Sequence, residues 1–177
     1  YEGPWAVSNA FVVYNNDMTT RMVMNYKWIN NRTTTDSYPV PSVKDTLSRF
    51  QGKTVYSTFD IIKAFNNVKV AEDSKKYTAF TTKYGTFVWN VMPFGGTNSP
   101  AVWARASDEC FRECRDMIKY VDDIIIASNR DETGSENENH LRAIESFFTC
   151  LSRYNLKIKL SKCQFFVKKV KFLGNII

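Results

Sequence analysis

Apolar and polar residues alternate over short stretches in the first half of the chain, which is the period-two pattern of strands with one buried face. AFVVYNND and TRMVMNY, within residues 10–26, predict two strands joined by a polar turn around residues 15–19. TAFTTKYGTFVWNV, residues 78–91, predicts another pair joined around Tyr84 and Gly85. We therefore expect two hairpins in this part of the chain.

Two further strand segments carry carboxylates. In residues 54–61, TVYSTFDI, two sets of positions alternate: Val55, Phe59 and Ile61 against Tyr56, Thr58 and Asp60. The pattern predicts one buried face, with Asp60 pointing away from it. The segment KYVDDIII, residues 119–126, is rich in strand-forming residues on both sides of two aspartates. It predicts a tight hairpin with Asp122 or Asp123 at or next to the turn.

Three segments combine a helix-start signal with apolar residues at helical spacing. Ser42 is followed by Asp45 at the capping-box position, Ser99 precedes a proline at the first helical position, and the acidic loop RDETGSENEN ends in the capping box 135–138. The residues expected to pack inward are Val43, Leu47 and Phe50 in the first helix, Cys110 and Cys114 in the second, and Leu141, Ile144, Phe148 and Leu151 in the third. Strands in hairpins joined by helices predict an α+β fold, an antiparallel sheet backed by helices.

Composition adds that this is one compact unit or two closely packed lobes. The chain has 177 residues, 44% of them hydrophobic, with no repeat or flexible linker, so any lobes are discontinuous in sequence. It shows no long apolar run, and we expect no membrane contact. Four cysteines and one histidine argue against a disulfide framework or a zinc site, so we expect reduced thiols in an intracellular protein.

Positive charge gathers at the end of the chain. The net charge is +6, and residues 151–177 hold seven basic residues and no acidic ones. A basic face suits contact with phosphates, although a solvated surface explains the same run equally well. The chain starts at Tyr1 without a methionine and stops directly after FLGNII, so we expect a fragment of a longer protein.

Carboxylates inside strand segments are costly unless they are paired, hydrogen-bonded or bound to a cation. Asp122 and Asp123 have no neighbouring histidine or evident arginine, which favours a divalent ion such as Mg²⁺. Together with Asp60 they could hold two ions for phosphoryl or nucleotidyl transfer. The competing interpretation is an aspartate-rich hairpin turn with no ligand, which two adjacent aspartates alone leave open.

With these residues placed, the chain resembles the reverse transcriptases of gypsy-type LTR retrotransposons, the metavirus group. Seven motifs occur in the family's order over essentially the whole chain: RMVMNYKWIN, YPVPSVKDTL, FDIIKAFNNVKV, KYTAFTTKYGTFVWNVMPFGGTNSPAVW, YVDDIIIAS, IKLSKCQFF and VKFLGNII. The resemblance implies a right-hand polymerase fold of fingers and palm. It places the fingers in residues 1–35 and 68–98, and the palm in residues 36–67 and 99–177, ending at the primer-grip motif with the thumb and ribonuclease H absent.

The resemblance also implies a role for single residues. Asp60, Asp122 and Asp123 match the metal-binding triad, Lys162 matches a lysine near the leaving pyrophosphate, and the carbonyl of Ile61 is an extra metal ligand. For the incoming nucleotide, Arg21 matches a residue on the triphosphate, Phe65 the aromatic gate that selects deoxynucleotides, and Phe94 and Gly95 the segment behind it. Phe172, Leu173 and Gly174 match the hairpin that grips the primer's 3′ end.

The implied activity is RNA-directed DNA polymerisation with Mg²⁺, or alternatively Mn²⁺. Its partners would be an RNA template, a DNA primer-template, dNTPs, and the rest of a Pol polyprotein with thumb, ribonuclease H and integrase. A dimer is compatible with the family. The implied location is a cytoplasmic particle, with the nucleus as the alternative.

Departures from the family pattern keep a second function open. The fingers carry NNDMTT for a lysine-rich turn and MNYK for VDYR, and Gly96 stands for a leucine. A captured, non-catalytic domain that serves as a structural or nucleic-acid-binding module would tolerate such changes. An RNA-templated RNA polymerase is disfavoured, because that class has an aspartate where Phe65 stands.

Overall fold

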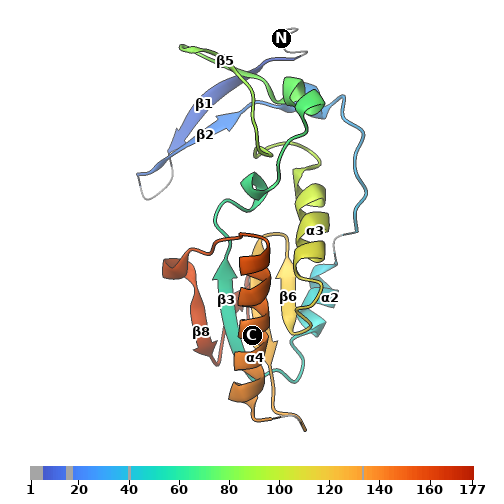
Figure 1. The fold of residues 1–177 in the computed structure, drawn as a ribbon, viewed down its shortest axis with the longest axis vertical. Helices are drawn as coiled ribbons and strands as arrows, with labels where there is room; N and C mark the ends of the chain where they lie inside the picture. Colours follow the sequence, from blue (N-terminus) through green and yellow to red (C-terminus); the bar gives the residue numbers. More distant parts are fainter. Residues whose placement is uncertain (1–5, 15–17, 40, 133) are drawn as a thin grey trace. The chain divides into compact units, whose positions relative to one another are not determined.

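The computed structural model describes residues 6–14, 18–39, 41–132 and 134–177. The chain divides into two compact units (Figure 1), each continuous in space and discontinuous in sequence. The first unit comprises Tyr1–Tyr38 and Lys63–Trp103, and the second comprises Pro39–Ile62 and Ala104–Ile177. No helix in the described part of the chain combines the length and the apolar character that a membrane span needs.

A four-stranded sheet forms the first unit, in the order β2-β1-β4-β5. Its strands are β1 (Ser8–Tyr14), β2 (Thr20–Met24), β4 (Phe80–Thr82) and β5 (Gly85–Phe87). The β1–β2 and β4–β5 pairs are antiparallel, which confirms both expected hairpins, and β1 runs parallel to β4. The predicted turn at 15–19 lies partly outside the described residues.

Short helices complete the first unit: α1 (Lys27–Asn30) and the 3₁₀ helices η1 (Ala64–Asn67) and η2 (Glu72–Thr78). Asn30 joins α1 to the segment after β5. Its side-chain Nδ2 donates to the Gly95 carbonyl at 2.8 Å, and its side-chain Oδ1 accepts from the backbone amide of Thr97 at 2.9 Å. Met24 of β2, Tyr26 and Phe80 of β4 form a small buried core of this unit.

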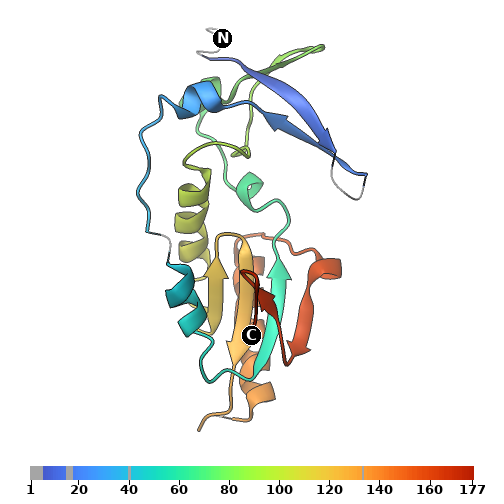
Figure 2. The ribbon, with the colours of Figure 1, turned by 180° about the vertical axis from the view of Figure 1, so that it is seen from behind.

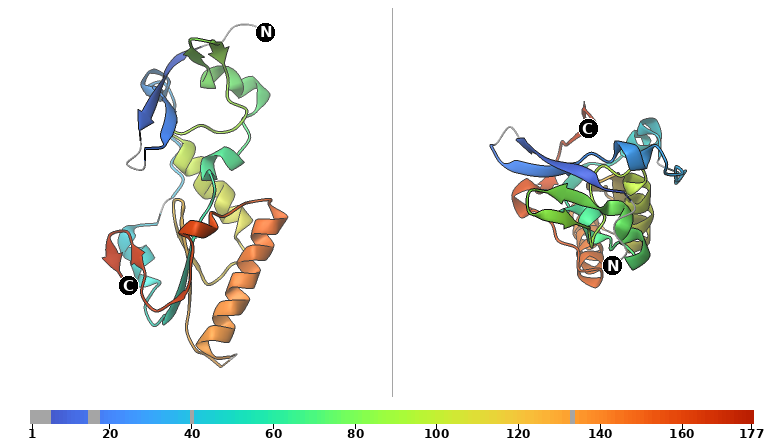
Figure 3. Two further views of the ribbon diagram at one scale, coloured as in Figure 1. Left: turned by 90° about the vertical axis from the view of Figure 1, so that its left-hand side faces the viewer. Right: turned by 90° about the horizontal axis from the view of Figure 1, so that it is seen from above.

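The second unit is an antiparallel sheet in the order β6-β7-β3-β8, as the α+β prediction requires. Its strands are β6 (Met117–Tyr120), β7 (Asp123–Ser128), β3 (Val55–Asp60) and β8 (Gln164–Val167). Helix α4 (Glu136–Arg153) packs along one face (Figure 3). The other face carries α2 (Val43–Ser48) and the hairpin of β9 (Lys171–Phe172) and β10 (Asn175–Ile176) (Figure 2). Helix α3 (Ser99–Cys110) contains a boundary between the units.

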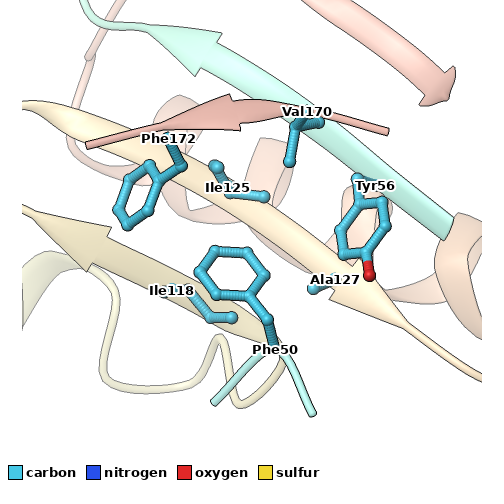
Figure 4. Close-up of a cluster of buried hydrophobic side chains, with 7 residues drawn as sticks. All are labelled: Phe50, Tyr56, Ile118, Ile125, Ala127, Val170 and Phe172. Carbon is cyan, nitrogen blue, oxygen red and sulfur yellow. The ribbon is translucent and has the colours of Figure 1, made fainter. Parts of the chain in front are cut away.

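A cluster of buried apolar side chains fixes the β9–β10 hairpin on its sheet face. Figure 4 shows its members: Phe50, Tyr56, Ile118, Ile125, Ala127, Val170 and Phe172. Tyr56, Ile125 and Ala127 alternate along their strands and therefore share this face. The Phe50 ring is centred 5.3 Å from that of Phe172 and 6.0 Å from that of Tyr56. Aromatic and aliphatic side chains therefore pack the hairpin against the sheet.

The prediction of one buried face for β3 is wrong, because both faces are covered. Tyr56 packs into the cluster of Figure 4, whereas Phe59, on the opposite face, packs against Phe147 of α4 at 4.6 Å between ring centres. β3 is an interior strand between β7 and β8, so its alternation marks two different packing layers rather than core and solvent.

Two helix starts are confirmed and one is not. Ser42 accepts a hydrogen bond from the Asp45 amide, and residues 135–138 form the full capping box. α3 instead begins at Ser99, whose hydroxyl donates to the Pro93 carbonyl at 3.1 Å. α3 ends at Cys110, so Cys114 lies beyond it, although still buried.

The predicted inward faces of two helices are wrong in part. Leu141 and Phe148 of α4 are 49% and 39% exposed. The buried stripe is rotated by about one residue and consists of His140, Ile144, Phe147, Cys150 and Leu151. Val43 of α2 is exposed, while Leu47 of α2 and Phe50, just after the helix, pack as expected. His140 therefore takes the core position in α4 that the apolar pattern assigned to its neighbour Leu141.

Candidate active site

Asp60 and Asp123 face each other at one edge of the second unit's sheet. Asp60 is the last residue of β3 and Asp123 the first of β7, and the two are register partners. An antiparallel pair places the end of one strand beside the start of the next. Two carboxylates far apart in sequence are thereby brought together.

Asp122 occupies the two-residue turn between β6 and β7, which confirms the predicted hairpin. Tyr120 and Asp123 form the closing pair of the turn, and Val121 has a positive φ of 56°. A β-branched residue rarely adopts this conformation, which costs about 1–3 kcal/mol and is typical of functional sites. The pairing of β6 with β7 holds this strained turn in place.

The carboxylates influence one another electrostatically. Desolvation at the strand end raises the pKa of Asp123, and the negative charges of Asp122 and Asp60 raise it further. A divalent cation would neutralise this repulsion, and carboxylate oxygens are the ligands that Mg²⁺ prefers. The donor set therefore fits a hard divalent ion. Among the described residues, however, no three His, Cys, Asp or Glu side chains converge as a complete ligand group.

Lys162 pairs with the first of these carboxylates. Its Nζ lies 2.9 Å from Oδ2 of Asp60. The backbone fixes this approach, because the Lys159 amide donates to the Asp60 carbonyl and the Ile62 amide donates to the Lys157 carbonyl, both at 2.8 Å. Lys162 then ends the short helix η3 (Leu160–Lys162).

The same backbone pairing orients the carbonyl of Ile61. Ile61 forms an isolated bridge with Ile158, and its hydrogen bonds use the groups of residues 60 and 62. Because backbone groups alternate sides along an extended strand, the Ile61 carbonyl points toward the side on which β7 lies. This orientation is compatible with its predicted role as a metal ligand.

A groove of about 560 Å³ opens beside the two carboxylates within the second unit. Its charged lining consists of Asp60, Asp123, Lys162, Lys169 and Lys171, with Phe172 and Gln164 among the other residues. Of the three lysines in this lining, the sequence singled out only Lys162. Lys169 and Lys171 were visible as part of the basic run, but nothing in the sequence separated them from its other lysines.

A partly buried lysine next to the aspartate hairpin also went unpredicted. Lys119 of β6 is hydrogen-bonded to Ala104 O, Ser107 Oγ and Asp108 Oδ1, at 3.1, 2.5 and 2.7 Å. It ties the hairpin that carries Asp122 to α3. The available signal was a lysine inside an otherwise apolar strand.

The predicted nucleotide-binding residues belong to the first unit. Phe65 and Phe94 pack edge to face, with ring centres 5.1 Å apart. Gly95 has φ = 90°, a conformation that favours glycine, and Arg21 is exposed on β2. The roles of these four residues toward a nucleotide stay predictions.

The predicted primer-grip residues form the β9–β10 hairpin. Phe172 is 3% exposed and belongs to the core of Figure 4, whereas Leu173 and Gly174 make the turn with positive φ angles of 50° and 82°. Phe172 therefore has a packing role in the structure, and contact of this hairpin with a primer stays a prediction.

An antiparallel sheet with carboxylates at the β3 and β7 ends, and a separate sheet-containing unit inserted between its segments, defines a right-hand polymerase with fingers and palm. The model of the family "Reverse transcriptase (RNA-dependent DNA polymerase)" matches residues 13–177, and the chain belongs to this family. Divalent metals are generally used in this family.

Curated relatives are viral and transposon polyproteins. The chain is 36% identical over 155 residues to the enzymatic polyprotein of Cauliflower mosaic virus (strain NY8153), covering 87% of this chain and 22% of that protein. It is 35% identical over 159 residues to the Pol polyprotein of transposon 297 of Drosophila melanogaster, covering 89% of this chain and 14% of that protein. The chain thus spans less than a quarter of either relative.

Solved structures show the same fold. A foamy viral protease-reverse transcriptase in complex with double-stranded DNA matches with a TM-score of 0.87 and 25% identity, over 97% of this chain and 29% of that chain. The same type of protein in complex with an RNA/DNA hybrid matches with a TM-score of 0.85 and 25% identity, over 99% of this chain and 23% of that chain. The predicted fold class is confirmed.

The domain boundaries predicted for fingers and palm stay predictions. The structural division assigns residues 63–67, with Phe65, to the first unit, whereas the sequence placed them in the palm. It also assigns 36–38 and 99–103 to the first unit. All three segments join one unit to the other.

Proposed function

We propose that this chain is the fingers and palm of a gypsy-type RNA-directed DNA polymerase that adds dNTPs to a primer 3′-hydroxyl. The observation that carries the proposal is the register pairing of Asp60 with Asp123, beside a groove lined by lysines. Carboxylates for cations next to ammonium groups for phosphates are what nucleotidyl transfer requires.

The metal in this proposal is Mg²⁺, with Mn²⁺ as a substitute. Asp60, Asp122, Asp123 and the Ile61 carbonyl would hold it. Bound divalent ions supply activation of the attacking hydroxyl and neutralisation of phosphate charge.

The protein's own residues do the rest. Lys162 faces the phosphates from the palm, and Arg21 holds the triphosphate from the fingers. Phe65 excludes a 2′-hydroxyl, with Phe94 and Gly95 lining the nucleotide site, and the hairpin of residues 171–176 positions the primer. The template would be RNA or DNA, as the nucleic acids bound in the foamy viral structures suggest.

The parent protein would be a Pol polyprotein. The relatives from Cauliflower mosaic virus and transposon 297 are both polyproteins of which this chain covers a small share. Thumb, ribonuclease H and integrase regions would lie elsewhere in such a parent.

The test is Mg²⁺-dependent extension of a primed RNA template by the parent-length protein. Asp122→Asn should abolish extension, while Asp116→Asn should not. Asp116 offers a matched control, because it pairs with Lys53 and does not line the groove. Equal activity in both variants would contradict the proposal.

A captured, non-catalytic module is the second candidate. It is favoured by the departures of the fingers from the family pattern, NNDMTT for a lysine-rich turn and MNYK for VDYR. Under this alternative, the wild-type protein would fold and bind primed template without extending it under any divalent metal.

A further inference from the structure

The Asp60 carboxylate already has a cationic partner. Oδ2 accepts a hydrogen bond from Lys162 Nζ at 2.9 Å. The backbone groups of Lys157 and Lys159 are bonded to those of Ile62 and Asp60, which places Lys162 beside the carboxylate. Lys162 is not a distant lysine that reaches the carboxylate by chance. It is placed there by a segment whose backbone is hydrogen-bonded to residues 60 and 62.

An ammonium group and a metal ion compete for the same carboxylate oxygen. The side chains of Lys162 and Asp60 are 57% and 38% exposed, and an exposed pair of this kind changes an equilibrium constant by only a few-fold. A divalent ion carries twice the charge and can take more than one oxygen. A divalent ion can therefore displace Lys162 from Asp60, and the ion pair is still strong enough to lower the affinity for that ion.

We propose that Lys162 is the resident counter-ion of Asp60, which a divalent cation displaces when it binds. Lys162 thereby weakens metal binding by the free protein and is released into the groove, where phosphates of a bound nucleotide would accept its charge. The inference rests on the proposed function in one respect, the assignment of Asp60 as a metal ligand.

The test measures Mn²⁺ binding to the full chain without nucleic acid. The electron paramagnetic resonance signal of free Mn²⁺ reports how much of the ion is bound. Lys162→Met should bind Mn²⁺ roughly 3- to 5-fold more tightly than the wild type, because it removes the competitor. Lys162→Arg should restore wild-type affinity. Circular dichroism checks that each variant folds.

Lys169→Met is the matched control. Lys169 lines the same groove and its loss changes the net charge equally, but the Asp60 oxygen is bonded to Lys162. A similar gain in Lys169→Met would show a general charge effect and overturn the proposal. Weaker or unchanged binding in Lys162→Met would overturn it as well.

These outcomes are separable from those of the polymerase assay. Extension that depends on Asp122, with equal Mn²⁺ affinity in the wild type and Lys162→Met, would overturn the displacement and leave the polymerase standing. Tighter Mn²⁺ binding in Lys162→Met, in a protein that extends no primer, would support the displacement and overturn the polymerase.

Discussion

Single residues decide the chemistry of this chain through their neighbours. Asp60 is an ordinary strand-end aspartate until Asp123 and Lys162 are placed beside it by two different strand pairings. The properties of His140, the only histidine, also depend on its neighbours, because it is fully buried between two serines. Its ring nitrogens lie 2.8 Å from Ser57 Oγ and 3.0 Å from Ser128 Oγ.

Burial makes His140 a source of acid lability. Desolvation lowers the pKa of His140 from 6.5 to about 4, so the folded state resists protonation that the unfolded state accepts. Stability should be unaffected above pH 6.5 and should fall as the pH drops toward 4. Between pH 7.5 and 5 the expected loss is about 2 kcal/mol in the free energy of unfolding.

Urea unfolding of the wild type and His140→Gln at both pH values measures this loss. Glutamine does not titrate, so the variant should lose less stability on acidification even if it is less stable at pH 7.5. Parallel losses in the two proteins would assign the acid lability to other groups.

The aromatic gate is the second prediction at this scale. If Phe65 has its proposed role, Phe65→Ala in the parent-length protein should raise incorporation of ribonucleotides by about tenfold or more, because the proposed steric block to the 2′-hydroxyl would be removed. Primer extension with rNTPs and dNTPs measures the ratio. Phe87→Ala, which removes an exposed aromatic of β5, should leave sugar discrimination unchanged.

Among the elements, the β9–β10 hairpin has a packing role in addition to its predicted contact with the primer. Phe172→Ala should lower the free energy of unfolding by about 3–5 kcal/mol, because it opens a cavity against Phe50 and Ile125. Ile176→Ala on the same hairpin, where the side chain is 78% exposed, should cost under about 0.5 kcal/mol. Denaturant unfolding compares them, and equal costs would refute the packing role.

Several elements could be predicted from the local sequence pattern alone. The hairpins, the capping box at 135–138 and the turn at Asp122 are set by local sequence, and all were predicted. The inward face of α4 was predicted only in part, because His140 takes a core position through hydrogen bonds with Ser57 of β3 and Ser128 of β7. A hydrophobic pattern does not register a polar residue that is satisfied in this way.

At the scale of the whole molecule, the basic C-terminal region should make nucleic-acid binding depend on salt. Lys169→Gln combined with Lys171→Gln should weaken binding of primed template at every sequence and reduce the slope of log affinity against log salt by about 2. Fluorescence anisotropy over a salt series measures this slope. Lys44→Gln combined with Lys53→Gln, outside the groove, should leave it unchanged.

Local patterns and the order of motifs were enough to predict the reverse transcriptase family, the strand and turn segments, and the residue types expected for metal-dependent nucleotidyl transfer. Which of those residues meet depends on the tertiary structure. The pairing of Asp60 with Asp123, the delivery of Lys162 to Asp60, and the burial of Phe172 each depend on the register of strands remote in sequence. Register is set by the packing of both sheet faces at once, and no local stretch of sequence contains that information.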